Sequence, residues 1–337
     1  MMTLNKPELL SVVTICFFIL VIVNNGDAQG CCGIGGSLVS GGHPVLNRNS
    51  FLVNVSGSYA DAKKPERRRG SVGLLLAYGI TDRLSLSLQT SYIRATYSPP
   101  LVIPALSIDS VVTHKNNGFG DGYAAVQYAV VKMTPVNKQE LVTGMDVGIP
   151  WGPYSKKVDG VELPGNVQTG TGGFSVNGFL TYLKAFPTIH YAVSSTIAGR
   201  VNFKTLRSFD PDQKERKLGK DPGDELSILL TSLLGPFFNA RGSLTFSYYR
   251  KWPTYDRNHL DPNRVKLVTS GQRLSLVPAL EYSILSNLRI LINADLPLWR
   301  EGSQIELSND RLFAAGVYWF IGKPGTASTE INIPQLR

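Results

Sequence analysis

The chain has 337 residues, a formal net charge of +9 at neutral pH and 43% hydrophobic residues. This length fits one large domain or two ordinary ones, and the hydrophobic content fits either a water-soluble protein or a β-barrel whose two faces average out along each strand. The basic residues lie mainly in hydrophilic connections, without a basic helix or the aromatic pattern of a nucleic-acid-binding module. The charge therefore does not predict a nucleic-acid partner.

The first element in chain order is an apolar run over residues 9–23. Its length, and the small residues Gly26 and Ala28 that follow it, are typical of a secretory signal peptide. We expect cleavage after residues 1–28, so that the mature chain starts near Gln29. An uncleaved N-terminal anchor helix is the alternative. No second apolar run of this kind follows, so a mature chain that crosses a membrane must do so with strands.

The next segment, residues 29–50, is rich in glycine and contains Cys31 and Cys32, the only cysteines that remain after cleavage. We expect it to lie in the periplasm, an oxidising compartment. Lipidation of Cys31 and a disulfide between the two neighbours both remain open. A metal site is the least favoured reading, because the other ligands that zinc needs are missing. We expect no metal and no other cofactor.

From residue 51 onward, apolar and polar residues alternate with a period of two, which is the pattern of strands. In one such stretch Leu84, Leu86 and Leu88 alternate with Ser85 and Ser87. The expected strands cover 51–60, 71–79, 83–96, 119–132, 140–151, 173–185, 189–205, 224–234, 240–253, 271–285, 288–300 and 311–322.

The connections between these strands alternate in length. Long polar links are expected at 61–70, 97–118, 153–172, 206–223, 254–270 and 301–310, with short links between them. Short periplasmic turns and longer external loops are typical of outer-membrane barrels. The pattern of residues 51–322 therefore predicts an all-β fold. We expect a transmembrane antiparallel up-and-down β-barrel of about 12 strands. Both ends, including the polar tail 323–337, are then periplasmic. A large β-sandwich is the alternative, but polar residues are too frequent on one face of the strands to build its dry core.

Two phrases resemble known barrels. Residues 78–86 (YGITDRLSL) resemble the strand–turn–strand phrase common in outer-membrane proteins. Residues 118–121 (GFGD), which open a strand after a long link, resemble the Gly-aliphatic-Gly-Asp step of the transporter-like barrels linked to meta-pathway phenol degradation. The resemblance extends over about residues 51–322, and it implies a channel for small or aromatic compounds. The chain departs from such barrels at its end, because Phe320 is followed by a polar tail instead of a terminal aromatic residue.

Charged residues inside the expected strands have the lowest free energy on the inner wall, because Arg or Lys facing lipid near the bilayer midplane destabilises the barrel by about 2–4 kcal/mol. The inner-wall candidates are Asp121, Asp146, Arg200, Lys204, Lys251, Glu281, Arg289 and Asp295. They either orient solutes in a polar pathway or close the barrel with ion pairs, and the sequence leaves both readings open.

The sequence carries no recognisable catalytic arrangement. His190 and Ser194 share a face of one expected strand, but they are about 13 Å apart at the rise of a strand, too far for a nucleophile and its base. We therefore expect an outer-membrane channel for passive or gated passage of small solutes, including hydrophobic or aromatic compounds, and no enzyme. A closed barrel that serves as an anchor or surface-binding protein is the alternative, and an outer-membrane hydrolase is less favoured. The expected partners are outer-membrane lipid and lipopolysaccharide, a small-molecule solute and the barrel-assembly machinery.

Overall fold

In the computed structural model, most of the chain from residue 45 to residue 322 can be described. The described residues are 45–63, 66–98, 100–101, 110–111, 114–134, 136–153, 157–158, 161–162, 169–170, 174–202, 220–221, 224–252, 254–256, 266–267, 270–302 and 311–322. The predicted signal peptide, Cys31, Cys32, Lys204 and the predicted tail lie outside them.

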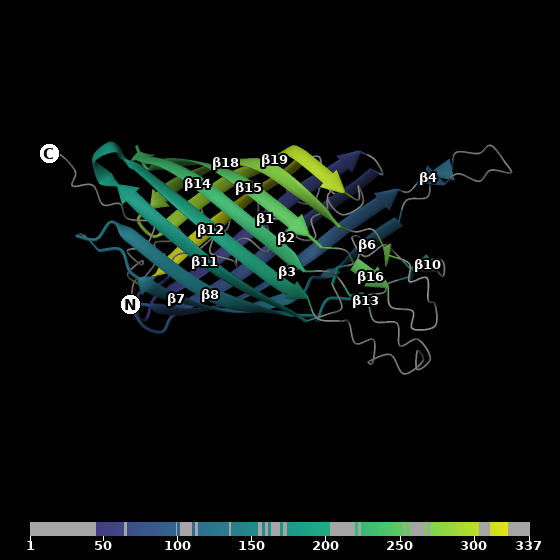
Figure 1. Cartoon of the computed structure of the whole chain (residues 1–337), viewed down its shortest axis with the longest axis horizontal. Helices are drawn as coiled ribbons and strands as arrows, with labels where there is room; N and C mark the ends of the chain where they lie inside the picture. The colour runs from purple at the N-terminus through teal and green to yellow at the C-terminus, as the bar shows by residue number, and fades with distance from the viewer. Residues whose placement is uncertain are drawn as a thin grey trace, which may run out of the picture.

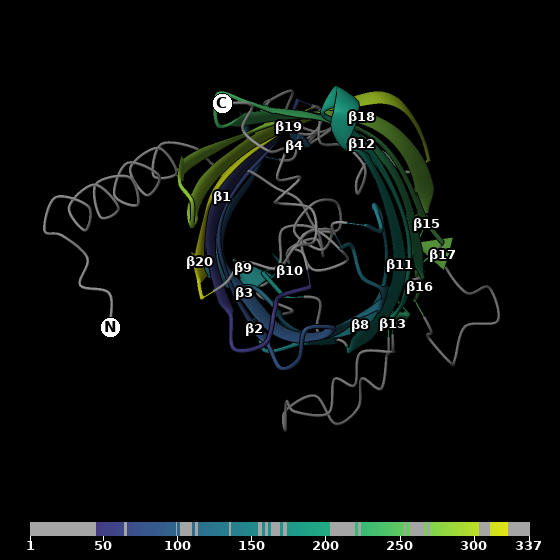
Figure 2. The same ribbon diagram turned by 90° about the vertical axis from the view of Figure 1, so that its left-hand side faces the viewer.

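Twelve long strands form one closed antiparallel barrel (Figures 1 and 2). They are β1 (Phe51–Lys63), β2 (Glu66–Gly79), β3 (Leu84–Ser98), β7 (Gly122–Val131), β8 (Gln139–Ile149), β11 (Ser175–Phe186), β12 (Tyr191–Asn202), β14 (Glu225–Phe237), β15 (Ala240–Lys251), β18 (Gly271–Leu285), β19 (Leu288–Gly302) and β20 (Arg311–Ile321). Each strand pairs with the next of these in the chain, and β1 pairs with β20 from Phe51 opposite Ile321 to Asp61 opposite Arg311. Closure leaves the sheet without an edge, so the backbone groups of every strand are paired on both sides.

The expected strands agree closely with the observed ones, and β18 has the predicted bounds. The prediction of a long link at 61–70 is wrong, because β1 and β2 continue through it and pair as far as Lys63 opposite Glu66. In this hairpin Asp61 lies opposite Arg68, so charged cross-strand partners extend the ladder beyond the apolar belt. Polar residues there mark the end of the apolar surface and not the end of the strand.

The two ends of the barrel differ, as the alternation of link lengths predicts. At one end, called the turn end here, the links are short, such as residues 286–287 between β18 and β19 and the 3-10 turn η1 (Pro187–Ile189) between β11 and β12. The opposite end, called the loop end, carries small additional pairings (Figure 1). These are β4 (Pro100–Leu101) with β5 (Ser110–Val111), β6 (His114–Phe119) with β3, β9 (Lys157–Val158) with β10 (Val161–Glu162), and β16 (Thr254–Asp256) with β13 (Lys220–Asp221) and β17 (Lys266–Leu267).

The wall of the barrel has an apolar outer face and a more polar inner face. Successive side chains of a strand point to opposite faces, and in β3 Leu86 is 45% exposed whereas its neighbour Ser87 is 4% exposed. The same contrast runs round the barrel, where the exposed outer positions include Leu74, Leu76, Leu88, Ile197, Leu230, Phe246, Leu280 and Ile292. A continuous apolar exterior on a closed barrel is the surface that hydrocarbon solvates. No helix among the described residues is long and apolar enough to cross a membrane.

Candidate functional site

The candidate site is the inner face of the barrel, where the strands place most of the charged residues predicted from the sequence. Asp146, Arg200, Glu281 and Asp295 each have an exposed apolar neighbour in the chain and are buried or half-buried, and Arg289 is buried beside the buried Leu288. Asp121 is buried at the start of β7, where its Oδ1 accepts a hydrogen bond of 3.2 Å from the backbone N–H of Gly152. Lys251 ends β15 and is half-buried, and Lys204 lies outside the described residues.

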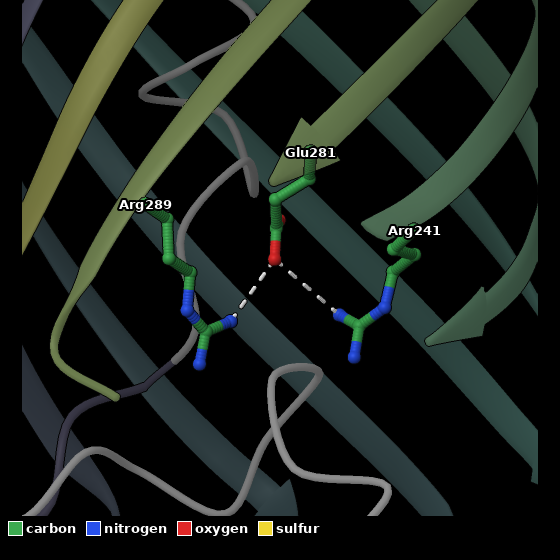
Figure 3. Close-up of polar contacts among 3 residues, drawn as sticks. All are labelled: Arg241, Glu281 and Arg289. Carbon is green, nitrogen blue, oxygen red and sulfur yellow. Dashed lines mark hydrogen bonds and ion pairs between the residues drawn. The ribbon is translucent and has the colours of Figure 1, made fainter. Parts of the chain in front are cut away.

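Near the turn end, three charged side chains from adjacent strands meet (Figure 3). The Glu281 Oε1 atom accepts a hydrogen bond of 3.1 Å from Arg289 Nη1 and lies 3.9 Å from Arg241 Nη1. Arg241 on β15 is the direct cross-strand partner of Glu281 on β18, and Arg289 lies diagonally across from it on β19. We call Arg241, Glu281 and Arg289 the arginine triad. Arg241 is absent from the sequence-based set, although its position opposite Glu281 in a hairpin is the signal that could have found it.

Further along the same wall, toward the loop end, acidic and basic groups pair one to one. Arg273 Nη2 lies 2.5 Å from Asp295 Oδ2, and Arg200 Nη1 lies 3.6 Å from Glu225 Oε2. Arg273 and Glu225 are not among the inner-wall candidates predicted from the sequence, although alternation along 273–284 already places Arg273 on the same face as Glu281. These cross-strand pairs compensate the buried charges, which supports the prediction that mixed signs share the inner wall.

Asp146 has a neutral partner instead. Its Oδ2 atom accepts a hydrogen bond of 2.6 Å from Asn177 Nδ2 on the neighbouring strand. Arg200 lies opposite Asn177 on the other side and stacks over the ring of Tyr123, 5.4 Å from the ring centroid. Three polar side chains and one aromatic ring therefore lie close together on this part of the wall.

Residues 45–50 pack against the inner face at the turn end, the end that Figure 2 views. Val45 and Leu46 are both 0% exposed. Val45 contacts a cluster from four strands, which consists of Ala129, Val142, Phe179 and Ala198. Leu46 joins a second cluster with Leu52, Leu75, Ala77 and Phe320. The sequence did not predict this placement, because a short apolar pair outside any periodic stretch gives no sign of where it is buried.

Hydrogen bonds hold the same segment in place. The backbone N–H of Leu46 donates to Ser85 Oγ at 3.1 Å, and that of Arg48 donates to Asp82 Oδ1 at 3.1 Å. Lys132, which follows β7, donates from Nζ to Asn47 Oδ1 at 2.7 Å and to the backbone oxygen of Asp82. Burial lowers the pKa of Lys132 from its ordinary value, and the Asp82 carboxylate opposes this shift.

The close approach of this segment to β2 requires glycine at position 79. A Cβ atom on Gly79 would lie 2.0 Å from the backbone oxygen of Asn47. In its place the backbones exchange hydrogen bonds, since Asn49 N donates to Gly79 O at 2.8 Å and Gly79 N donates to Ser50 O at 2.9 Å. Residues 78–86, which the sequence predicts to be a strand–turn–strand segment, thus also bind residues 45–50.

The described residues show no group of three His, Cys, Asp or Glu side chains that could hold a metal ion. His190 lies in the turn after η1 at φ +52°, and its ring packs 5.5 Å from that of Phe237. The described contacts of the inner wall are ion pairs, hydrogen bonds and apolar contacts.

A closed antiparallel barrel with an apolar exterior and a charged inner wall defines the class of transmembrane β-barrels. The chain matches the crystal structure of the COG4313 outer membrane channel from Pseudomonas putida F1 with a TM-score of 0.62 and 12% sequence identity, covering 83% of this chain and 98% of that chain. It also matches the NanC porin (TM-score 0.45, 11% identity, 79% of this chain and 98% of that one) and the KdgM porin (0.44, 7%, 80% and 98%). A scan against protein-family models and a search of curated proteins each find no match. The chain therefore shares the fold of the COG4313 channel. A sequence identity of 12% shows a common fold and nothing further.

Proposed function

We propose that the chain is an outer-membrane channel for small solutes and that residues 45–50 gate its turn end. The observation that carries the proposal is the contrast between the apolar outer face and an inner wall lined by charged pairs that run toward the loop end. The polar groups on the inner face offer a small solute hydrogen-bonding and charged partners that the apolar outer face does not. The shared fold with an outer-membrane channel supports the same function.

The gate is proposed because residues 45–50 lie against the inner face at the turn end. The segment is held by two apolar residues and a few hydrogen bonds, and it is not a strand of the barrel. Its release exposes the inner wall at that end without disturbing the strand ladder. We place the turn end in the periplasm, since short turns face that side in outer-membrane barrels. The mature protein then reaches the membrane after loss of residues 1–28, with help from the barrel-assembly machinery, and contacts lipid and lipopolysaccharide.

The solutes include hydrophobic or aromatic compounds. This part of the proposal is supported by the Arg289 guanidinium, which lies 5.2 Å from the ring centroid of Phe320 and so places a charge beside an aromatic ring on the inner wall. A purely hydrophilic pore does not need buried aromatic side chains on its wall.

Planar-bilayer conductance of the refolded mature protein tests the proposal. We expect single-channel steps for the wild type and larger steps for the double variant Val45→Ser/Leu46→Ser, which loses the apolar contacts of the gate. A folded protein that shows no steps in either form supports the second candidate, a closed barrel acting as an anchor or surface-binding protein. The occupied turn end is the observation that favours that candidate.

A further inference from the structure

We infer that a group of basic side chains on the outer wall at the loop end binds the phosphate groups of lipopolysaccharide. The group consists of Arg68 on β2, Arg94 on β3 and Lys115 on β6, and we call it the basic patch. All three side chains are exposed, and their strands lie side by side at the loop end (Figure 1). The inference rests on the proposed orientation, in which the loop end faces outward. It names where the anionic lipid of the outer leaflet contacts the barrel.

The first argument is the direction of the side chains. Successive side chains of a strand point to opposite faces. Ala95, beside Arg94, is 1% exposed and faces the interior, whereas Tyr92 is 44% exposed and shares the outer face with Arg94. On β6, the inner-facing neighbour of Lys115 is Asn116, which is 2% exposed. The basic patch therefore projects away from the interior of the barrel.

The second argument is the strand register, which brings the three side chains together. Thr96 on β3 lies opposite Arg68 on one side and opposite Lys115 on the other. Arg94 precedes Thr96 by two residues, so it shares their face and lies diagonally from both. Neighbouring strands lie about 4.8 Å apart, and diagonal neighbours on one face lie about 7–8 Å apart. Long basic side chains at this spacing can reach the same phosphate group.

The third argument is the height of the patch on the wall. The outward-facing residues of β3 from Leu84 to Tyr92 are apolar or aromatic apart from Thr90. Leu84 and Arg94 are ten residues apart, which is about 33 Å along a strand and about 25 Å along the barrel axis at a tilt of about 40°. The apolar band of an outer-membrane barrel is about 25 Å tall. Arg94 therefore lies at the level of the lipid headgroups.

The fourth argument is an aromatic pair that lies next to the patch on the side of the turn end. The rings of Tyr92 and Phe119 contact each other edge to face, with 5.6 Å between their centroids. The hydroxyl of Tyr92 accepts a hydrogen bond of 3.2 Å from Nδ2 of Asn117, the cross-strand partner of Arg94. Aromatic rings are typical of the border between acyl chains and headgroups, and basic side chains bind the anionic headgroups beyond it. The patch and the aromatic pair thus match successive layers of one lipid.

The basic side chains also have contacts within the protein, and the site does not require them to be idle. Arg68 and Arg94 both take part in further interactions, and Asp61 lies opposite Arg68 on the side away from β3. Contacts between exposed charged side chains are weak, because water and salt screen them. A phosphate carries more charge than a carboxylate and accepts two parallel hydrogen bonds from one guanidinium. It can therefore join or replace such contacts.

Lys184 on β11 provides the contrast. It is an exposed, outward-facing cation near the turn end, where its Nζ lies 5.4 Å from the ring centroid of Phe186. Its cross-strand partners, Gln139 and Val193, are uncharged. Lys184 thus resembles a member of the basic patch in type and exposure, but it lies at the other end of the barrel.

The test is a titration of the refolded mature protein with lipid A that carries both phosphates, in neutral detergent, followed by native mass spectrometry. Lipid A without phosphates and phosphatidylglycerol are the comparison lipids. We expect the wild type to retain the phosphorylated lipid A in preference to both. Arg94→Gln and Lys115→Gln should each weaken its binding about fivefold, equivalent to about 1 kcal/mol for one basic group at a membrane surface. Lys184→Gln is the control and should bind lipid A like the wild type.

Folding of each variant is checked by the heat-dependent shift of its gel mobility, and Lys115→Gln carries the test if Arg94→Gln does not fold. Equal retention of lipid A with and without phosphates by the wild type overturns the inference. So does an unchanged affinity in both patch variants, or an equal loss in Lys184→Gln. Retention of phosphatidylglycerol as strong as that of lipid A overturns the assignment to lipopolysaccharide.

Lipid binding is measured without any current, so the inference and the proposed channel fail separately. Phosphate-dependent binding of lipid A by a protein that does not conduct supports the patch and contradicts the channel. Conductance without phosphate-dependent binding does the reverse.

Discussion

Lys132 Nζ lies 2.7 Å from Asn47 Oδ1, and this hydrogen bond ties the end of β7 to the segment that precedes β1. The same ammonium group also donates to the backbone oxygen of Asp82 in the turn between β2 and β3. One side chain thus joins two turns of the barrel to the proposed gate. Its removal is the most direct way to weaken the gate without touching the inner wall.

Lys132→Met should therefore loosen residues 45–50. We expect a loss of about 1 kcal/mol in the free energy of docking, the net worth of ordinary hydrogen bonds at a partly exposed site. Single-channel recording should show longer or larger open steps for the variant. Lys138→Met is the control, because this lysine lies in the same link and has no described contact with residues 45–50. Equal effects of both substitutions would contradict the role of Lys132.

The open fraction should also depend on pH in the alkaline range. Burial lowers the pKa of Lys132 below its ordinary value of 10.5, and the contact with Asn47 makes residues 45–50 part of that burial. The docked arrangement should therefore bind the proton less tightly than the undocked one. Docking therefore becomes more favourable as the pH rises through the window that ends near 10.5, and conductance should fall. In Lys132→Met this fall should disappear. A fall of the same size in the variant means that other groups cause it.

Gly79→Ala should displace the gate by a steric route. The added Cβ would lie 2.0 Å from the backbone oxygen of Asn47, and relief of such an overlap typically costs about 1–3 kcal/mol. We expect residues 45–50 to become accessible to protease in the folded variant and conductance to rise. Gly178→Ala is the matched control, since a Cβ there meets nothing within 4 Å. Unchanged protease resistance in Gly79→Ala would show that the segment can shift without leaving its seat.

The strand pattern was predictable because the bilayer imposes it on the sequence. Leu86 and Ser87 could be assigned to opposite faces from alternation alone, and the link lengths gave the strand order of an up-and-down barrel. The hairpin at 61–70 is not predictable from composition, because its polar residues continue the strands β1 and β2 beyond the apolar belt. The sequence predicts two members of the arginine triad, because Glu281 and Arg289 are charged residues within expected strands. It does not predict Arg241, which lies near the end of its strand. The burial of Val45 and Leu46 depends on contacts with residues far away in the chain. A local sequence pattern does not predict such contacts.

The two faces of β3 give a stability prediction. Leu86→Arg should cost about 2–4 kcal/mol in lipid, because the charge faces hydrocarbon. Ser87→Arg faces the interior, so folding should tolerate it, and the current or the solute preference should change. Phe246→Arg and Ser247→Arg should repeat the contrast on β15. Denaturant unfolding in lipid vesicles, followed by tryptophan fluorescence, measures it. Equal stability of the two arginine variants within either pair is the result that a lipid-facing outer wall does not allow.

The orientation of the barrel gives a labelling prediction. Single cysteines at Arg67, Lys156, Lys214 and Arg257 should react with an impermeant reagent on whole cells, because the loop end faces outward. Cysteines at Asp82, Asn137 and Ser286, placed at the turn end, should react only after the outer membrane is opened. The background lacks Cys31 and Cys32. Labelling of the second group on intact cells would contradict this orientation and would place the turn end outside.

The central claim is that the closed barrel conducts solutes and that residues 45–50 limit the flow. The most direct measurement is the single-channel conductance of refolded wild type beside Val45→Ser/Leu46→Ser, with folding of both confirmed in the same bilayers. Conducting steps in the wild type and larger steps in the variant are the predicted result. Two folded proteins that both remain silent at every voltage would contradict it.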